Sequence, residues 1–238
     1  MAANRDEFYD RPSARAHFWE QAPELLAGRD LKAGGTWLGM TRQGRLGMIT
    51  NYRDPASIKQ NAPSRGRLLS RFLLTQDSPL NFLLGVQQER DQYNGFNLIV
   101  GDQDQLYWYS NRNGDPLPLT PGLYGLSNHL LDTPWPKVAR GKDLMANLLA
   151  KQTSPSPSTL FRLLEDRTIP PEDTLPHTGV GLEWERMLSP IFISSPSYGT
   201  RSSTVLLIDQ QDRVTFVERT FNGSPEPTSS VKHAFKLE

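Results

Sequence analysis

Hydrophobic and polar positions alternate with a period of two in two stretches of the first half of the chain, which predicts two β-hairpins. The first pair of strands flanks the polar segment 42–45, in which Gly44 can adopt a positive φ. The second pair flanks the polar segment 101–104. The strands predicted in this way are 36–41 with 46–50, and 96–100 with 106–109.

Other stretches of the chain repeat their apolar residues at helical spacing. Two such stretches lie between the hairpins and are separated by Asp77-Ser78-Pro79, whose Ser-Pro pair can start the second helix. A third helix is expected to enter at Trp135-Pro136, and the segment 154–157 ends it before a short successor. The helical stretches are 68–73, 80–86, 135–149 and 160–164.

The last third of the chain reads as a loop followed by strands. Residues 168–190 contain several prolines and glycines and predict a long loop, which in a compact domain is usually functional or mobile. Strands are predicted at 203–208 and 214–217, and the alternation over 231–237 suits an edge strand.

The order of elements predicts the fold class. Strands that arrive in sequential hairpins form antiparallel sheets, and the helices between them cover the sheet faces. No internal repeat and no linker interrupts the pattern. The sequence therefore predicts one α+β domain over residues 1–238.

Composition removes several classes of function. The 238 residues carry 26 basic and 26 acidic side chains, so the net charge is zero and no long-range field draws the chain to nucleic acid or to an anionic membrane. No apolar run approaches the ~20 residues of a membrane-spanning helix, and the first residues lack a signal-peptide pattern. We expect a cytoplasmic protein without a membrane span.

The chain contains no cysteine, which excludes disulfides, thiolate metal sites and a cysteine nucleophile from these residues. The four histidines are not spaced as zinc ligands, so no metal site is predicted. Met40 stands where the phosphate loop that Gly34–Gly39 superficially resembles would need lysine. Gly125-Leu-Ser-Asn-His129 lacks the second glycine of a nucleophile elbow. No cofactor is predicted.

Short polar clusters beside the ends of predicted strands remain as candidates. Donors fixed at one end of a sheet can converge to form an active site. The alternative is structural: asparagine and glycine are ordinary turn residues, and Arg5 with Asp6 can form a structural ion pair.

These clusters, in their order along the chain, resemble the NRDE family, which is also called the transport and Golgi organization protein 2 family. The resemblance runs from residue 3 to about residue 220 and begins with the string that gives the family its name. The motifs are Asn4–Glu7, Gly34–Gly39, Thr50–Tyr52, Tyr93–Asn97, Tyr124–Asn128, Thr133–Trp135 and Tyr198–Arg201.

The resemblance implies a four-layer αββα sandwich of antiparallel sheets, related to the N-terminal nucleophile hydrolases of the cysteine branch. In those enzymes an N-terminal cysteine attacks an amide carbonyl. By this analogy Asp6, or Glu7 in its place, would hold the α-amino group, and Arg5 would lower the pKa of the thiol. Asn51 and Asn128 would polarise the carbonyl oxygen, and Arg201 would complete the site.

Members of this family usually begin with Met-Cys and an apolar strand that leads into the Asn-Arg-Asp-Glu string. Here the chain begins at Met1-Ala2-Ala3, so we expect this first strand and its cysteine to be absent. A start assigned too late and a truncated, non-catalytic relative are the two explanations. The first is favoured because a sheet that loses a strand exposes unpaired backbone groups.

Two functions follow from the resemblance. The first is an amidohydrolase-like enzyme that acts on a non-peptide C–N bond, with a small-molecule amide as substrate. The second is non-enzymatic handling of haem or a lipid, or a trafficking role related to Golgi organisation and secretion. Trp184 and Met187, in the loop 168–190, could border a ligand cleft, although Trp184 is equally explained by packing.

Overall fold

The computed structural model describes residues 1–152 and 154–238. Within these residues the chain is an α+β protein with two antiparallel sheets, as the sequence predicts. It divides into two compact units, each formed from separate segments of the chain. Unit 1 comprises Met1–Arg11, Leu123–Gly125 and Pro134–Leu237, and unit 2 comprises Pro12–Gly122, Leu126–Thr133 and Glu238.

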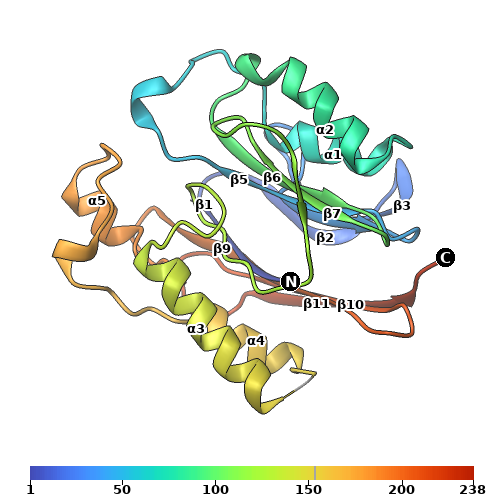
Figure 1. Ribbon diagram of the computed structural model, residues 1–238. Helices are drawn as coiled ribbons and strands as arrows, with labels where there is room; N and C mark the ends of the chain where they lie inside the picture. Colours follow the sequence, from blue (N-terminus) through green and yellow to red (C-terminus); the bar gives the residue numbers. More distant parts are fainter. Residues whose placement is uncertain (153) are drawn as a thin grey trace. The chain divides into compact units, whose positions relative to one another are not determined.

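Unit 1 contains a four-stranded sheet in the order β1-β9-β10-β11, in which every neighbouring pair is antiparallel. Helices α3 and α4 lie on one face of this sheet (Figure 1). Leu160 and Phe161 of α4 pack against Val205 and Val217 of the strands, and all four side chains are buried. The elements are β1 (Ala2–Phe8), α3 (Pro136–Lys151), α4 (Pro157–Leu164), η3 (Glu172–Thr174), α5 (Leu182–Met187), β9 (Tyr198–Ile208), β10 (Arg213–Thr220) and β11 (Ser229–Lys236).

Unit 2 contains a seven-stranded sheet whose strands follow one another in chain order from β2 to β8. Helices α1 and α2 cover one face of this sheet (Figure 1), and Phe72 and Leu83 belong to its buried core. Ser78 caps α2 by accepting a hydrogen bond from Asn81 N at 3.4 Å. The elements are β2 (Ser13–Trp19), β3 (Ala22–Asp30), β4 (Leu38–Thr41), β5 (Leu46–Asn51), η1 (Pro55–Ser57), α1 (Gly66–Leu74), α2 (Pro79–Gln88), η2 (Arg90–Gln92), β6 (Phe96–Gly101), β7 (Leu106–Ser110) and β8 (Leu117–Leu119).

The start of the chain differs from the prediction. The Asn-Arg-Asp-Glu string was expected to follow a strand that this chain lacks, but the string itself lies inside β1, an edge strand of the four-stranded sheet. A run of four polar residues has little β-propensity by itself. Pairing with β9 along residues 2–8 overrides this weak local preference.

Three other strands were missed, and the loop 168–190 was predicted with too little structure. Strands β2, β3 and β8 were not predicted, partly because the pairing of β2 with β3 contains two irregularities that disturb the alternation. The loop contains η3 and α5, which are only three and six residues long. Helices this short give no clear period in the sequence. Across the described residues, no helix has the length and apolar character needed to cross a membrane.

Candidate functional site

The edge of the four-stranded sheet carries the residues that the resemblance singled out in unit 1. Arg5 lies opposite Ser202, and Asp6 lies opposite Thr200, so Arg201 is an extra residue in β9. This arrangement is a β-bulge, which bends the strand and changes the direction of a side chain. Asp6 and Arg201 therefore come together at one irregularity of the sheet.

The guanidinium of Arg201 binds the backbone of the turn that follows β1. Its Nη1 atom donates hydrogen bonds to the carbonyl oxygens of Phe8 (2.9 Å), Tyr9 (2.9 Å) and Arg11 (3.1 Å). A charged donor that satisfies three carbonyl groups is a strong clamp. In this structure Arg201 fixes the path of the chain as it leaves β1.

Asp6 is held by a hydroxyl group. Its Oδ1 atom accepts a hydrogen bond from Thr200 Oγ1 at 2.7 Å, and the same hydroxyl accepts one from Ile193 N at 3.0 Å. Thr200 is buried. The aspartate thus terminates a short chain of hydrogen bonds that links β1, β9 and the segment before β9.

The other residues of the string have different partners. Asn4 Nδ2 donates to the carbonyl oxygens of Leu164 and Ile191, each at 2.9 Å, and Asn4 Oδ1 accepts from Ser203 Oγ at 2.6 Å. The Glu7 carboxylate accepts from Phe8 N and lies 3.6 Å from Arg11 Nε. The string therefore holds β1 to its surroundings through side chains as well as through the sheet.

The two predicted asparagines meet in unit 2. Asn51 ends β5, and its carbonyl oxygen accepts a hydrogen bond from Asn128 Nδ2 at 3.1 Å. The carbonyl oxygen of Asn128 accepts one from Arg53 N at 2.7 Å. The segment 126–133 therefore runs beside the end of β5, as the proximity of the two motifs would require.

His129, in the same segment, forms a contact that the sequence did not reveal. Its Nε2 atom lies 2.8 Å from Tyr52 Oη, and its Nδ1 atom lies 2.8 Å from Thr133 Oγ1. The carbonyl oxygen of His129 accepts from Asn97 Nδ2 at 2.9 Å. Burial lowers the pKa of His129 below its usual 6.5 and raises that of Tyr52 above 10. A neutral imidazole between two hydroxyl groups suits this site, because one ring nitrogen donates and the other accepts.

Replacing His129 with glutamine is expected to lower the free energy of unfolding by about 1–2 kcal/mol at pH 8, because the contacts to Tyr52 and Thr133 cannot both be kept. Because the pKa of His129 is lowered in the folded protein, the wild type loses stability as the pH falls from 6.5 towards the folded-state pKa. The difference in the free energy of unfolding between the wild type and His129→Gln, measured by urea titration, should therefore become smaller over this pH range. The exposed His177→Gln change is the control, and a difference that stays constant from pH 8 to pH 5 would contradict the assignment.

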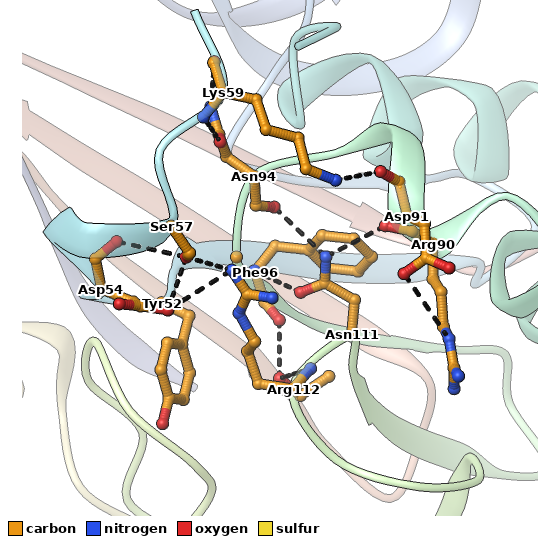
Figure 2. Close-up of polar contacts among 12 residues, drawn as sticks. Tyr52, Asp54, Ser57, Lys59, Arg90, Asp91, Asn94, Phe96, Asn111 and Arg112 are labelled. Atoms are coloured by element: carbon orange, nitrogen blue, oxygen red, sulfur yellow. Dashed lines mark hydrogen bonds and ion pairs between the residues drawn. The ribbon is translucent and has the colours of Figure 1, made fainter.

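The loop after β5 is fixed by a separate polar cluster (Figure 2). Ser57 Oγ donates to Asp54 Oδ2 at 2.5 Å, and Arg112 donates to Ser57 Oγ and lies 3.5 Å from the Asp54 carboxylate. Lys59 N donates to Asn94 Oδ1 at 2.7 Å. Through these contacts the Ser57 hydroxyl ties the loop to Asp54 and Arg112.

Three aromatic rings meet in unit 1 where β1 ends and β9 begins. Phe8 and Tyr198 are directly opposite each other in the two strands, with ring centroids 5.1 Å apart. Trp184 of α5 lies 6.5 Å from Phe8 and 5.9 Å from Tyr198. Phe8 and Trp184 remain 45% and 41% exposed. We call Phe8, Trp184 and Tyr198 the aromatic triad; only Trp184 had been considered as a cleft residue from the sequence.

Comparison with known proteins gives a consistent match. The family model described as "Transport and Golgi organisation 2" matches residues 1–223. The "Transport and Golgi organization protein 2 homolog" of Bos taurus is 39% identical over 255 residues, which cover 100% of this chain and 92% of that protein. The protein of the same name from Homo sapiens is 40% identical over 92% of this chain and 85% of its own length. The Drosophila melanogaster "Transport and Golgi organization protein 2" is 28% identical over 94% of this chain and 86% of its own length.

Proposed function

Because the chain belongs to the transport and Golgi organisation 2 family, we propose that it handles a small amphipathic ligand, haem or a lipid, by non-covalent binding. The proposal treats residues 1–238 as a single domain of that family. The names of the relatives refer to transport, and a carrier without a chemical step is one way to fill such a role.

The observation that carries the proposal is the set of hydrogen bonds that Arg201 and Asp6 form. In the hydrolase analogy these side chains surround a nucleophile. Here Arg201 donates to three backbone carbonyl groups, and Asp6 accepts from a buried hydroxyl. Side chains engaged in this way stabilise the edge of the sheet, which a binding protein needs as much as an enzyme does.

The aromatic triad supports binding as the function. Large aromatic side chains that remain two-fifths exposed next to one another are a feature of ligand and partner sites on proteins. Packing alone would favour burial of Phe8 and Trp184, because each ring has a large apolar surface.

A binding experiment combined with a hydrolysis assay tests the proposal. Haemin is titrated into the purified chain and followed by Soret absorbance, and fluorescent vesicles of phosphatidylcholine or phosphatidylglycerol are incubated with it and separated by flotation. We expect saturable binding to at least one probe and no release of product from penicillin V, a substrate of the cysteine-branch acylases. Turnover of penicillin V, or the absence of binding to every one of the three probes, would contradict the proposal.

An amidohydrolase-like reaction on a non-peptide C–N bond is the second candidate, and the bulge at Arg201 favours it because bulges often adjoin active sites. Arg5, Asp6, Asn51, Asn128 and Arg201 would then keep the roles that the resemblance assigns to them. Asp6→Asn is the matched variant for this reaction, since it keeps an oxygen that can accept from Thr200 while removing the charge. A lower kcat with unchanged stability would support the second candidate.

A further inference from the structure

Two connections leave the seven-stranded sheet of unit 2 at the same end. Strand β3 ends at Asp30, and β5 ends at Asn51. Both strands pair with β4 in antiparallel fashion, so their last residues lie at the same end of the sheet. The turn 31–35 follows β3, and the segment 52–65 follows β5 and extends beyond the sheet (Figure 1). These two connections are therefore neighbours.

The first turn of α1 joins the two connections. The segment 52–65 leads directly into α1, and Arg67 Nε donates a hydrogen bond to the carbonyl oxygen of Ala33 at 2.8 Å. Thr36 N donates one to the carbonyl oxygen of Gly66 at 3.2 Å. We call residues 31–35 and 52–67 the loop face.

The loop face carries the two most exposed large apolar side chains among the described residues. Ile58 is 66% exposed, and Leu31 is 57% exposed. A lysine follows each of them, and both Lys59 and Lys32 are exposed as well. Single exposed apolar residues are common on protein surfaces. The repetition of the same pair, an apolar side chain followed by a cation, on two neighbouring connections distinguishes the loop face.

Hydrogen bonds fix the backbone on both sides of Ile58 (Figure 2). Ser57 Oγ donates to the Asp54 carboxylate, and Lys59 N donates to Asn94 Oδ1 at 2.7 Å. Asn94 Nδ2 in turn donates to the carbonyl oxygen of Lys59 at 3.1 Å. The exposed isoleucine is therefore presented by an anchored loop.

Leu31 is anchored in a similar way. Its backbone N donates to the carbonyl oxygen of Pro12 at 3.0 Å. Asp30 Oδ1 accepts from Lys32 N at 3.0 Å and from Ala33 N at 3.2 Å, which fixes the turn. Both apolar side chains are thus positioned before a partner arrives, which lowers the entropic cost of binding.

The charge of the loop face differs from that of the whole chain. The 238 residues have no net charge, whereas residues 30–35 and 52–67 contain five basic and two acidic side chains. Both acidic side chains have partners, since Asp30 accepts from the turn and Asp54 lies 3.5 Å from Arg112. Three exposed cations of the loop face form no ion pair with any described residue: Lys32, Lys59 and Arg67.

An anionic lipid surface fits this arrangement better than a protein does. Lysine is depleted in protein interfaces, and charged residues are rare at their apolar centres. On the loop face each apolar side chain adjoins a lysine. At a membrane surface an apolar side chain can enter the boundary with the acyl chains while a neighbouring lysine reaches the lipid phosphates. The adjacent η2 does not change the balance of charge, because Arg90 lies 4.0 Å from Asp91.

We propose that the loop face docks the protein reversibly on an anionic phospholipid bilayer. Ile58 and Leu31 enter the interface, and Lys32, Lys59 and Arg67 bind the phosphates of lipid headgroups. Each cation strengthens binding by roughly fivefold at low salt, and salt screens this attraction. The docking surface goes beyond the proposed carrier function, since docking needs no bound ligand.

Vesicle flotation tests the electrostatic part of the proposal. The purified chain is mixed with vesicles of phosphatidylcholine or of phosphatidylglycerol. We expect flotation with phosphatidylglycerol only, and its loss at high salt. Lys59→Glu should weaken binding by about tenfold or more, because it removes an attraction and adds a repulsion. Lys236→Glu makes the same change of charge at an exposed position of β11 and should alter binding by less than about twofold.

A fluorescent label tests whether the apolar side chain enters the bilayer. The chain has no cysteine, so Ile58→Cys provides a single site for an environment-sensitive dye. We expect its emission to rise and to shift to shorter wavelength when phosphatidylglycerol vesicles are added. Leu149→Cys, at a 43% exposed position of α3, is the control and should show no change. Ile58→Ser should weaken flotation by about fivefold, and circular dichroism checks that each variant is folded.

The possible failures are distinguishable. Equal weakening by Lys59→Glu and Lys236→Glu, an unchanged label at residue 58 on floating protein, or no flotation with phosphatidylglycerol would overturn the docking surface. Binding of poly-glutamate without flotation would overturn it in favour of an acidic protein partner. Haemin titration of Lys59→Glu keeps the carrier function separate, because haemin binding needs no docking and should be unchanged in this variant.

Discussion

Replacing Arg201 with methionine is expected to lower the free energy of unfolding by about 3 kcal/mol. Methionine keeps much of the apolar stem but donates no hydrogen bond, so the carbonyl groups of Phe8, Tyr9 and Arg11 lose a charged partner together. The turn after β1 should then detach from β9. Equilibrium unfolding in urea measures the loss, and hydrogen exchange locates it in residues 2–11.

The control for this variant is Arg213→Met. Arg213 forms an ion pair with Asp209 at 2.7 Å, but its side chain is 67% exposed, so its loss should cost less than about 1 kcal/mol. The stability of Arg201→Lys should lie between that of the wild type and that of Arg201→Met, because an ammonium group keeps the charge but loses the planar geometry of the guanidinium. If Arg201→Met were as stable as Arg213→Met, the clamp would have no energetic role.

Replacing Asn4 with aspartate is expected to be as damaging as the Arg201 change, although the two side chains have nearly the same shape. Asn4 Nδ2 donates to two carbonyl oxygens, and a carboxylate at this place would face both of them without a proton to share. We expect Asn4→Asp to lower the free energy of unfolding by about 3 kcal/mol at pH 7. Asn4→Ala should lower it by less, because alanine leaves the two carbonyl groups unpaired but adds no repulsion.

The pH dependence distinguishes this explanation from a packing defect. Facing carbonyl oxygens would raise the pKa of the new carboxyl above its unfolded value, so the penalty is present above the folded-state pKa and is relieved as the pH falls through it. Urea unfolding at pH 7 and pH 4.5 should therefore show the penalty of Asn4→Asp shrinking in acid relative to that of Asn4→Ala. Asn147→Asp, on the exposed side of α3, is the control. A penalty that is independent of pH would contradict the proposed cause.

The strands and helices that the sequence predicted are those with a strong local signal. The hairpin of β4 and β5 has a polar turn with Gly44 at φ +84°, and α2 begins at a Ser-Pro pair whose serine caps it. Strand β1 lacks such a signal because its polar residues are stabilised by β9, almost 200 positions away along the chain. Pairing over that distance cannot be read from local periodicity.

The candidate site was predictable to a similar extent. The resemblance assigned Asn51 and Asn128 to one site, and in the structure Asn128 Nδ2 donates to the backbone carbonyl oxygen of Asn51. Their role in polarising a carbonyl oxygen stays a prediction. The Tyr52–His129 contact follows from the same approach of the two segments, yet the sequence offered only an isolated histidine. The triad needs Phe8, Trp184 and Tyr198 from three elements, and only the fold brings them together.

The two sheets differ in how early they can form during synthesis. In unit 2 each strand pairs with its neighbour in the chain, so the sheet can grow as successive hairpins emerge from the ribosome. In unit 1 the first strand must wait for its partner, since Ala2 pairs with Val205. Until then β1 lacks the partner with which it pairs in the folded protein. Its dense polar string, Asn4 to Glu7, gives the nascent chain a segment that resists aggregation during this delay.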